Sequence, residues 1–136
     1  MPHELKESPD SIEISVTAAG RDELFRAALE GVLSAACPRV PEGKGDGRVV
    51  PVQAAGADDE TLLAGLVEDT LRAVREEPGT LLPPRWLAFD EHRVTANLPL
   101  AGPKAEDRGL ALAAASVEPA GDGWAARIEL VRAPLR

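Results

Sequence analysis

Residues 56–78 have the sequence GADDETLLAGLVEDTLRAVREEP, which contains a helix with recognisable ends. Asp58 and Asp59 are favourable N-cap residues, and acidic side chains in a first turn suit the positive end of the helix dipole. Apolar residues then recur at steps of three and four, so they share one face. These residues are Leu63, Leu66, Val67, Leu71 and Val74. Glu68 and Arg72 can pair on the outer face, and the closing proline ends the helix.

An earlier segment has the same plan. Ile12–Ala18 alternates apolar and polar residues, which predicts a half-buried strand. A turn at Gly20 follows, and a helix begins at about Asp22. A short strand over Val49–Ala54 then leads into the helix of residues 56–78. The two segments together predict two consecutive β-α units.

Only strands are expected after the second helix. The predicted strands are Trp86–Phe89, Val94–Leu100, Leu110–Val117 and Trp124–Val131. The order β-α-β-α-β-β-β-β predicts one α/β domain over residues 10–136, with two helices covering a sheet layer. Residues 1–9 are polar, and we expect them to form a flexible N-terminus.

Composition excludes several classes of function. The 136 residues are 44% hydrophobic, enough for one compact core, and the net charge is −8. An acidic chain with few aromatic residues argues against tight binding to nucleic acid. The single cysteine, Cys37, excludes a disulfide within the chain and a Cys-rich zinc site. Since no signal peptide and no run of about 18 apolar residues is present, we expect a cytoplasmic protein without membrane partners.

Four stretches of the chain carry a resemblance to a known family. Residues 16–32 contain Val-x-Ala-x-Gly, then Glu-Leu-Phe, Ala-Ala and Gly-Val; residues 50–63 end in Gly-x-Asp-x-Glu-x-Leu-Leu. With the strands over 86–100 and 123–128, they resemble the archease family over nearly the whole chain. The resemblance implies an α/β sandwich that acts as a non-enzymatic protein cofactor. Archeases promote guanylylation and turnover of the GTP-dependent RNA-splicing ligase of tRNA splicing and RNA repair. They hold a divalent metal with acidic side chains at one end of the fold.

The chain departs from the family pattern at the metal site. The family's opening His-Thr-Ala-Asp falls on residues 10–13, so that Asp10 and Glu13 remain as candidate ligands. The acidic position at the end of the last strand falls on Val131, and a slip in register would bring Glu129 there instead. We therefore expect no cofactor, or a weakly bound divalent cation such as calcium, magnesium or manganese. The alternative, which we favour, is that Asp10 and Glu13 are solvated surface residues.

No other group of residues carries a recognisable chemistry. His92 lies between two predicted strands, and Glu106 and Asp107 are adjacent in a polar loop, where turn and surface roles are the default. No nucleophile–base pair can be named. Three functions stay open: an archease-like accessory protein of an RNA-splicing ligase, a protein-binding scaffold that reuses the fold for another partner, and, least supported, a small hydrolase.

Overall fold

A computed structural model describes most of the chain, namely residues 3–36, 47–77, 79–82, 84, 87–90, 92–101 and 109–132. Within these residues the chain forms two helices and eight strands in a single small domain. The elements in chain order are β1 (His3–Glu7), β2 (Ser11–Ala18), α1 (Arg21–Ala36), β3 (Val49–Ala55), α2 (Asp59–Glu76), β4 (Thr80–Leu81), β5 (Leu87–Asp90), β6 (Arg93–Ala101), β7 (Leu110–Ala120) and β8 (Gly123–Arg132). The predicted mixed α/β class and the two β-α units are confirmed.

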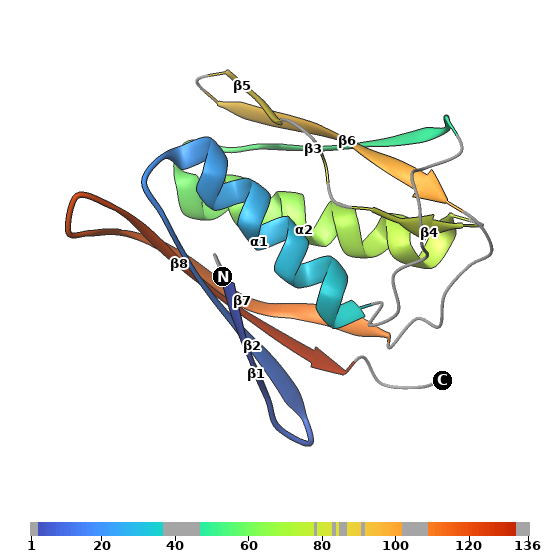
Figure 1. The fold of residues 1–136 in the computed structure, drawn as a ribbon, viewed down its shortest axis with the longest axis horizontal. Coiled ribbons are helices and arrows are strands. Elements are labelled where there is room, and N and C mark those ends of the chain that lie inside the picture. Colours follow the sequence, from blue (N-terminus) through green and yellow to red (C-terminus); the bar gives the residue numbers. More distant parts are fainter. Residues whose placement is uncertain are drawn as a thin grey trace.

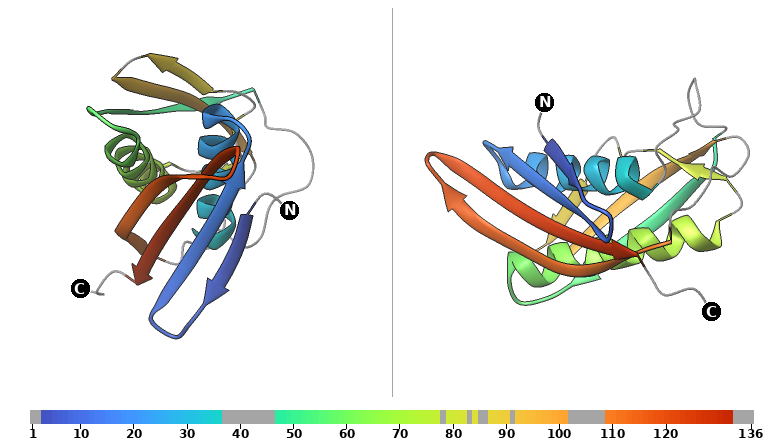
Figure 2. Two further views of the ribbon diagram at one scale, coloured as in Figure 1. Left: turned by 90° about the vertical axis from the view of Figure 1, so that its left-hand side faces the viewer. Right: turned by 90° about the horizontal axis from the view of Figure 1, so that it is seen from below.

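The strands form two sheets with both helices between them (Figure 1). Sheet A has the strand order β1-β2-β8-β7, and sheet B has the order β3-β6-β4 with β5 also paired to β6. Helix α1 packs mainly on β2, whereas α2 contacts both β3 of sheet B and β7 of sheet A. The left-hand view in Figure 2 shows the same three layers. We call the two helices together the helix layer.

The prediction that two helices cover one sheet layer is therefore wrong, because the helices are covered on two sides. The buried surface of α2 is wider than one stripe. It includes the predicted residues together with Leu62, Thr70 and Ala73. A helix packed between two sheets needs this wide apolar face, and the narrower predicted stripe describes only part of it.

The ends of α2 follow from local chemistry. The Asp58 carboxylate accepts a 2.8 Å hydrogen bond from the Thr61 backbone N–H, which confirms the predicted N-cap. This hydrogen bond lowers the pKa of Asp58 below its ordinary value. The predicted Glu68–Arg72 pair is wrong: the Arg72 guanidinium contacts Asp69 at 2.8 Å and also Glu76. These neighbours lie three and four residues away on the same helix, so they can reach Arg72 as well as Glu68 could.

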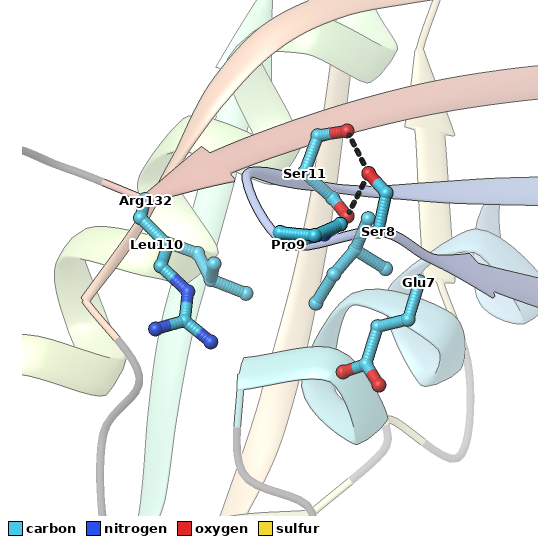
Figure 3. A pocket seen from close by; sticks show the side chains of 7 residues that line it. Glu7, Ser8, Pro9, Ser11, Leu110 and Arg132 are labelled. Carbon is cyan, nitrogen blue, oxygen red and sulfur yellow. Dashed lines mark hydrogen bonds between the residues drawn. The ribbon is translucent and has the colours of Figure 1, made fainter.

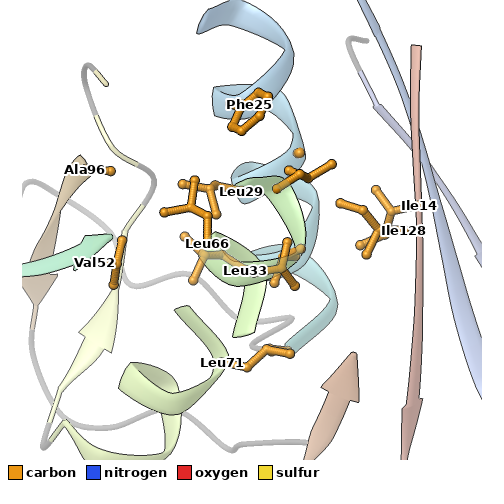
Figure 4. Packing of buried hydrophobic residues seen from close by; sticks show 14 of the residues in the cluster. Ile14, Phe25, Leu29, Leu33, Val52, Leu66, Leu71, Ala96 and Ile128 are labelled. Carbon is orange, nitrogen blue, oxygen red and sulfur yellow. The ribbon is translucent and has the colours of Figure 1, made fainter. Parts of the chain in front are cut away.

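Because apolar and polar residues alternate along the strands, the apolar face of each sheet packs against the helix layer. Ile14 of β2 and Ile128 of β8 are fully buried from sheet A, and Val52 of β3 and Ala96 of β6 from sheet B. Figure 4 shows these side chains on opposite sides of the helix layer, with Leu66 of α2 between the two sheets. Thr70 is one of the few buried polar residues, and its hydroxyl donates to the Leu66 carbonyl at 2.8 Å. The interior is therefore mainly apolar, and the buried Thr70 hydroxyl has a hydrogen-bond partner.

An aromatic and ionic cluster joins the starts of both helices to β5. The Phe25 and Phe89 rings meet edge to face at 5.1 Å. The Arg21 guanidinium lies 4.5 Å from the Phe89 centroid and forms a 2.6 Å ion pair with Asp59. Because these residues come from α1, α2 and β5, the cluster ties sheet B to the helix layer.

The N-terminal segment is ordered into a strand. Residues 1–9 were expected to be flexible, but His3–Glu7 forms β1, antiparallel to β2, so the prediction is wrong for these five residues. Backbone hydrogen bonds to a neighbouring strand can hold an edge strand whose side chains stay exposed. The polar sequence of β1 therefore shows no apolar alternation that would predict a strand. Neither helix in the described part of the chain is long and apolar enough to cross a membrane.

Candidate metal centre

The two predicted ligands lie at one end of sheet A. Asp10 is exposed in the turn between β1 and β2. Ser8 closes this turn: its backbone N–H donates to the Ser11 carbonyl at 2.9 Å, and the two hydroxyls are 2.9 Å apart. Glu13 follows on β2, on the face of sheet A that points away from the helix layer, which we call the outer face. The strand alternation in the sequence predicts this place for Glu13.

Strand register decides which side chains surround Glu13. Glu13 lies directly opposite Glu129 of β8 and opposite Lys6 of β1. Val131, the position that the family pattern assigns to a metal ligand, lies opposite Ser11 instead. The last strand therefore does place an acid beside Glu13, two residues before Val131. Register cannot be derived from the sequence of either strand alone, which is why Glu129 could be named only as an alternative.

Basic side chains offset the charge of the two facing acids. Like charges directly opposite each other on neighbouring strands destabilise a sheet. The Arg127 Nε lies 3.4 Å from the Glu13 carboxylate oxygen Oε1, and the two side chains are 70% and 37% exposed. With Lys6 on the other side of Glu13, the site has two carboxylates and two cations. The local field that would attract a divalent cation is correspondingly weak.

The described residues do not assemble a complete ligand set for a metal ion. A hard divalent cation takes about six oxygen ligands. Among the residues that the structure describes, no group of three or more His, Cys, Asp or Glu side chains is placed to hold one. Weak or absent metal binding stays a prediction for titration.

A small pocket opens beside the same turn. Its volume is about 260 Å³, and Figure 3 shows the Arg132 guanidinium and the Glu7 carboxylate on its two sides. The rest of its lining comes from the turn, β2 and β7, namely Ser8, Pro9, Ser11, Ile12 and Leu110. A wall with one cation and one anion has no net charge to select an ion of either sign. The pocket therefore does not extend the metal site.

Of the remaining candidates, only His92 lies among the residues that the structure describes. His92 is exposed between β5 and β6, and its backbone carbonyl accepts a 2.9 Å hydrogen bond from the Gly56 N–H. This contact links β3 to the β5–β6 turn, which is a structural role. Cys37, Glu106 and Asp107 lie outside the described residues.

No protein-family model matches the chain, and no curated protein is significantly similar to it.

Proposed function

We propose that the protein is an archease-like accessory protein that promotes guanylylation and turnover of a GTP-dependent RNA-splicing ligase and has no catalytic centre of its own. The observation that supports this proposal is the arrangement of the chain. Within the described residues, two consecutive β-α units, β2-α1 and β3-α2, are followed by strands only. This is the order on which the family resemblance rests.

Surface charge supports a protein partner. The chain has a net charge of −8, so it is attracted to a basic surface and repelled by phosphate backbones. A ligase that binds RNA must present such a basic surface to its substrate. Electrostatic complementarity of this kind accelerates association and orients the two proteins. The proposed site of action is the cytoplasm, where the ligase and its RNA substrates would meet.

The test is the rate of ligase guanylylation. Purified ligase from the same cell is incubated with GTP and manganese, with and without this protein, and the covalent ligase–GMP adduct is measured over time. We expect faster adduct formation and multiple turnovers in ligation when the protein is present. A pull-down with the same two purified proteins measures binding separately from stimulation.

A second function is favoured by one specific observation. Glu13, the residue at the family's metal position, is ion-paired to Arg127 and lies opposite Lys6, and Val131 replaces the second acid. A scaffold that keeps the fold for another partner would tolerate such a corner, because fold alone does not determine function. If the protein neither stimulates nor binds the ligase, the scaffold function becomes the better supported of the two. Stimulation that is lost in Glu13→Ala would show that the corner is used and would rule the scaffold function out.

A further inference from the structure

The free edges of the two sheets differ in how they are protected. An unpaired edge strand offers N–H and C=O groups to another strand, so proteins shorten it, charge it or cover it. In β3, Pro51 has no N–H to offer, and the Gln53 N–H donates to the Asp69 carboxylate of α2 at 2.9 Å. The strands β4 and β5 at the other edge of sheet B have two and four residues. The edge strand β1 has five residues, and three of them, Glu4, Lys6 and Glu7, are charged.

The strand β7 lacks these protections over most of its length. It has 11 residues, and within the described chain it pairs only with β8. In an antiparallel ladder, alternate residues direct their backbone groups away from the paired strand. Residues 110–117 have the sequence LALAAASV, which contains no charged residue and no proline. The edge strand β3 is also uncharged, but residues 110–117 lack the proline that β3 carries.

The apolar side chains of β7 lie on its inner face, where they can meet the same side chains of a second copy of β7. Leu110, Leu112, Ala115 and Val117 face the helix layer; Leu110 is buried, whereas the other three are only partly buried at the edge. A bulge between Leu112 and Ala114 keeps apolar residues on the inner face along both halves of the strand. The partly buried residues can still gain contacts from a further strand.

We propose that β7 pairs with β7 of a second copy of this chain, antiparallel and about a two-fold axis, joining the two copies of sheet A into one continuous sheet. With the axis between Ala113 and Ala114, Leu110 lies opposite the partner copy's position 117, and Leu112 opposite its position 115. Inner-face apolar residues then meet inner-face apolar residues, and small residues meet on the outer face. A two-fold interface requires this self-complementarity.

The uncharged segment lets two acidic copies approach each other. Two chains of charge −8 repel each other wherever their acidic surfaces meet. The segment 110–117 is an edge at which they can approach without placing like charges opposite each other. A basic partner, by contrast, gains no charge complementarity from an uncharged strand. This dimer is independent of the proposed ligase function.

The test compares a charge on β7 with the same charge elsewhere on the outer face. Ala114→Lys places two cations beside the two-fold axis, whereas Thr17→Lys places one on β2, an interior strand of the same sheet; both positions are exposed. Sedimentation equilibrium over a concentration series should give twice the monomer mass for the wild type and for Thr17→Lys. In Ala114→Lys the dissociation constant should rise roughly tenfold or more. Mixing Ala114→Lys with Ala114→Glu should restore the dimer.

Hydrogen exchange locates the interface. Outward-pointing amides of β7 should be protected in the wild type and exchange faster in Ala114→Lys, while the amides of α2 stay unchanged. If circular dichroism shows that Ala114→Lys does not fold, Ser116→Lys, also at an exposed position of β7, takes its place. A wild type that is monomeric up to its solubility limit, or a dimer that Ala114→Lys leaves intact, would overturn the proposal.

Discussion

The helix layer and the outer face of sheet A lie on opposite sides of the same strands, but different forces determine their residues. Leu66 in the helix layer is 0% exposed and packs between two sheets. Glu13 on the outer face has a side chain that is 37% exposed, and its ion-pair partner Arg127 is 70% exposed. Burial makes each interior contact expensive to lose, whereas solvent screens the surface pair.

The difference between the two regions shows where residues can change without loss of the fold. A buried residue of the helix layer cannot be shortened without loss of packing. A residue of the outer face can be replaced at little cost in stability. Val131 and Arg127 both lie on that face, opposite Ser11 and Ser15. Residues at this corner could therefore change while the fold was kept.

Leu66→Asp should have the largest effect. The substitution removes leucine contacts worth roughly 2–5 kcal/mol and also places a carboxylate in an apolar interior. Because a domain of this size is stable by roughly 5–15 kcal/mol, we expect it to be unfolded or nearly so. Circular dichroism and thermal melting measure the result, with Glu68→Asp at an exposed position of the same helix as control. A variant that melted like the wild type would disprove the buried position of Leu66.

Gly65→Val tests how closely α2 approaches sheet B. A Cβ atom at Gly65 would lie 2.9 Å from the Ala54 Cβ, which is attached to the backbone and cannot rotate away. Overpacking of this kind costs roughly 1–3 kcal/mol, so urea denaturation should show a clear loss of stability. Glu68→Val, on the exposed side of α2, measures the intrinsic cost of valine in the helix. Equal losses in the two variants would mean that α2 can move away from β3.

The loss of stability in acid should come from the exposed N-cap residue Asp58 and not from the buried residues of the helix layer. The pKa of Asp58 is lowered by the hydrogen bond from Thr61, so the folded state binds this proton less readily than the unfolded state. The contribution of Asp58 is complete above the ordinary carboxyl pKa of 3.8 and is lost as the pH falls through the lowered value. Asp58→Asn should therefore show a shallower loss of Tm on acidification than the wild type.

The control for this measurement is Asp58→Ala, which removes the N-cap at every pH. Its Tm should be lower than that of the wild type at neutral pH and should approach it in acid. If Asp58→Asn and the wild type lost stability in parallel, the Asp58 cap would not depend on its charge.

Metal titration should give the smallest effect. Calorimetry with calcium and manganese should detect weak or no binding to the wild type, and metal should hardly change its Tm, because a ligand stabilises only according to its occupancy. Arg127→Ala removes the cation that lies 3.4 Å from Glu13 and should strengthen any binding. Asp10→Ala and Glu13→Ala should then abolish it. Micromolar binding to the wild type that disappears in Glu13→Ala would show that the metal corner is intact.

Local sequence was sufficient for elements whose ends have their own chemistry. The N-cap at Asp58 and the alternation in Ile12–Ala18 identify α2 and β2 to within a residue or two. Both signals depend on neighbours within one turn or one strand. The charged strand β1 has no such signal, because pairing with β2 and not burial of its side chains holds it. The strand β4 has only two residues, which are too few to show a periodicity although both are buried.

The candidate site could be predicted only in part. Alternation placed Glu13 on a solvent-facing strand position, and the structure confirms it. Its neighbours Lys6, Arg127 and Glu129 come from two other strands, one of them more than 100 residues away in the chain. Local periodicity contains no information on which residues of distant strands lie side by side.

Amino-acid order was thus enough to establish the two helices, the strand alternation and the acidic surface, since each depends on residues close together in the chain. Tertiary packing established that the helices lie between two sheets and that Glu13 faces Glu129 and Arg127. It also leaves β7, uncharged over residues 110–117, at an edge of sheet A in the described part of the chain. The physical reason is that these features depend on how strands far apart in sequence pair and on which surfaces are left uncovered after every apolar face is buried.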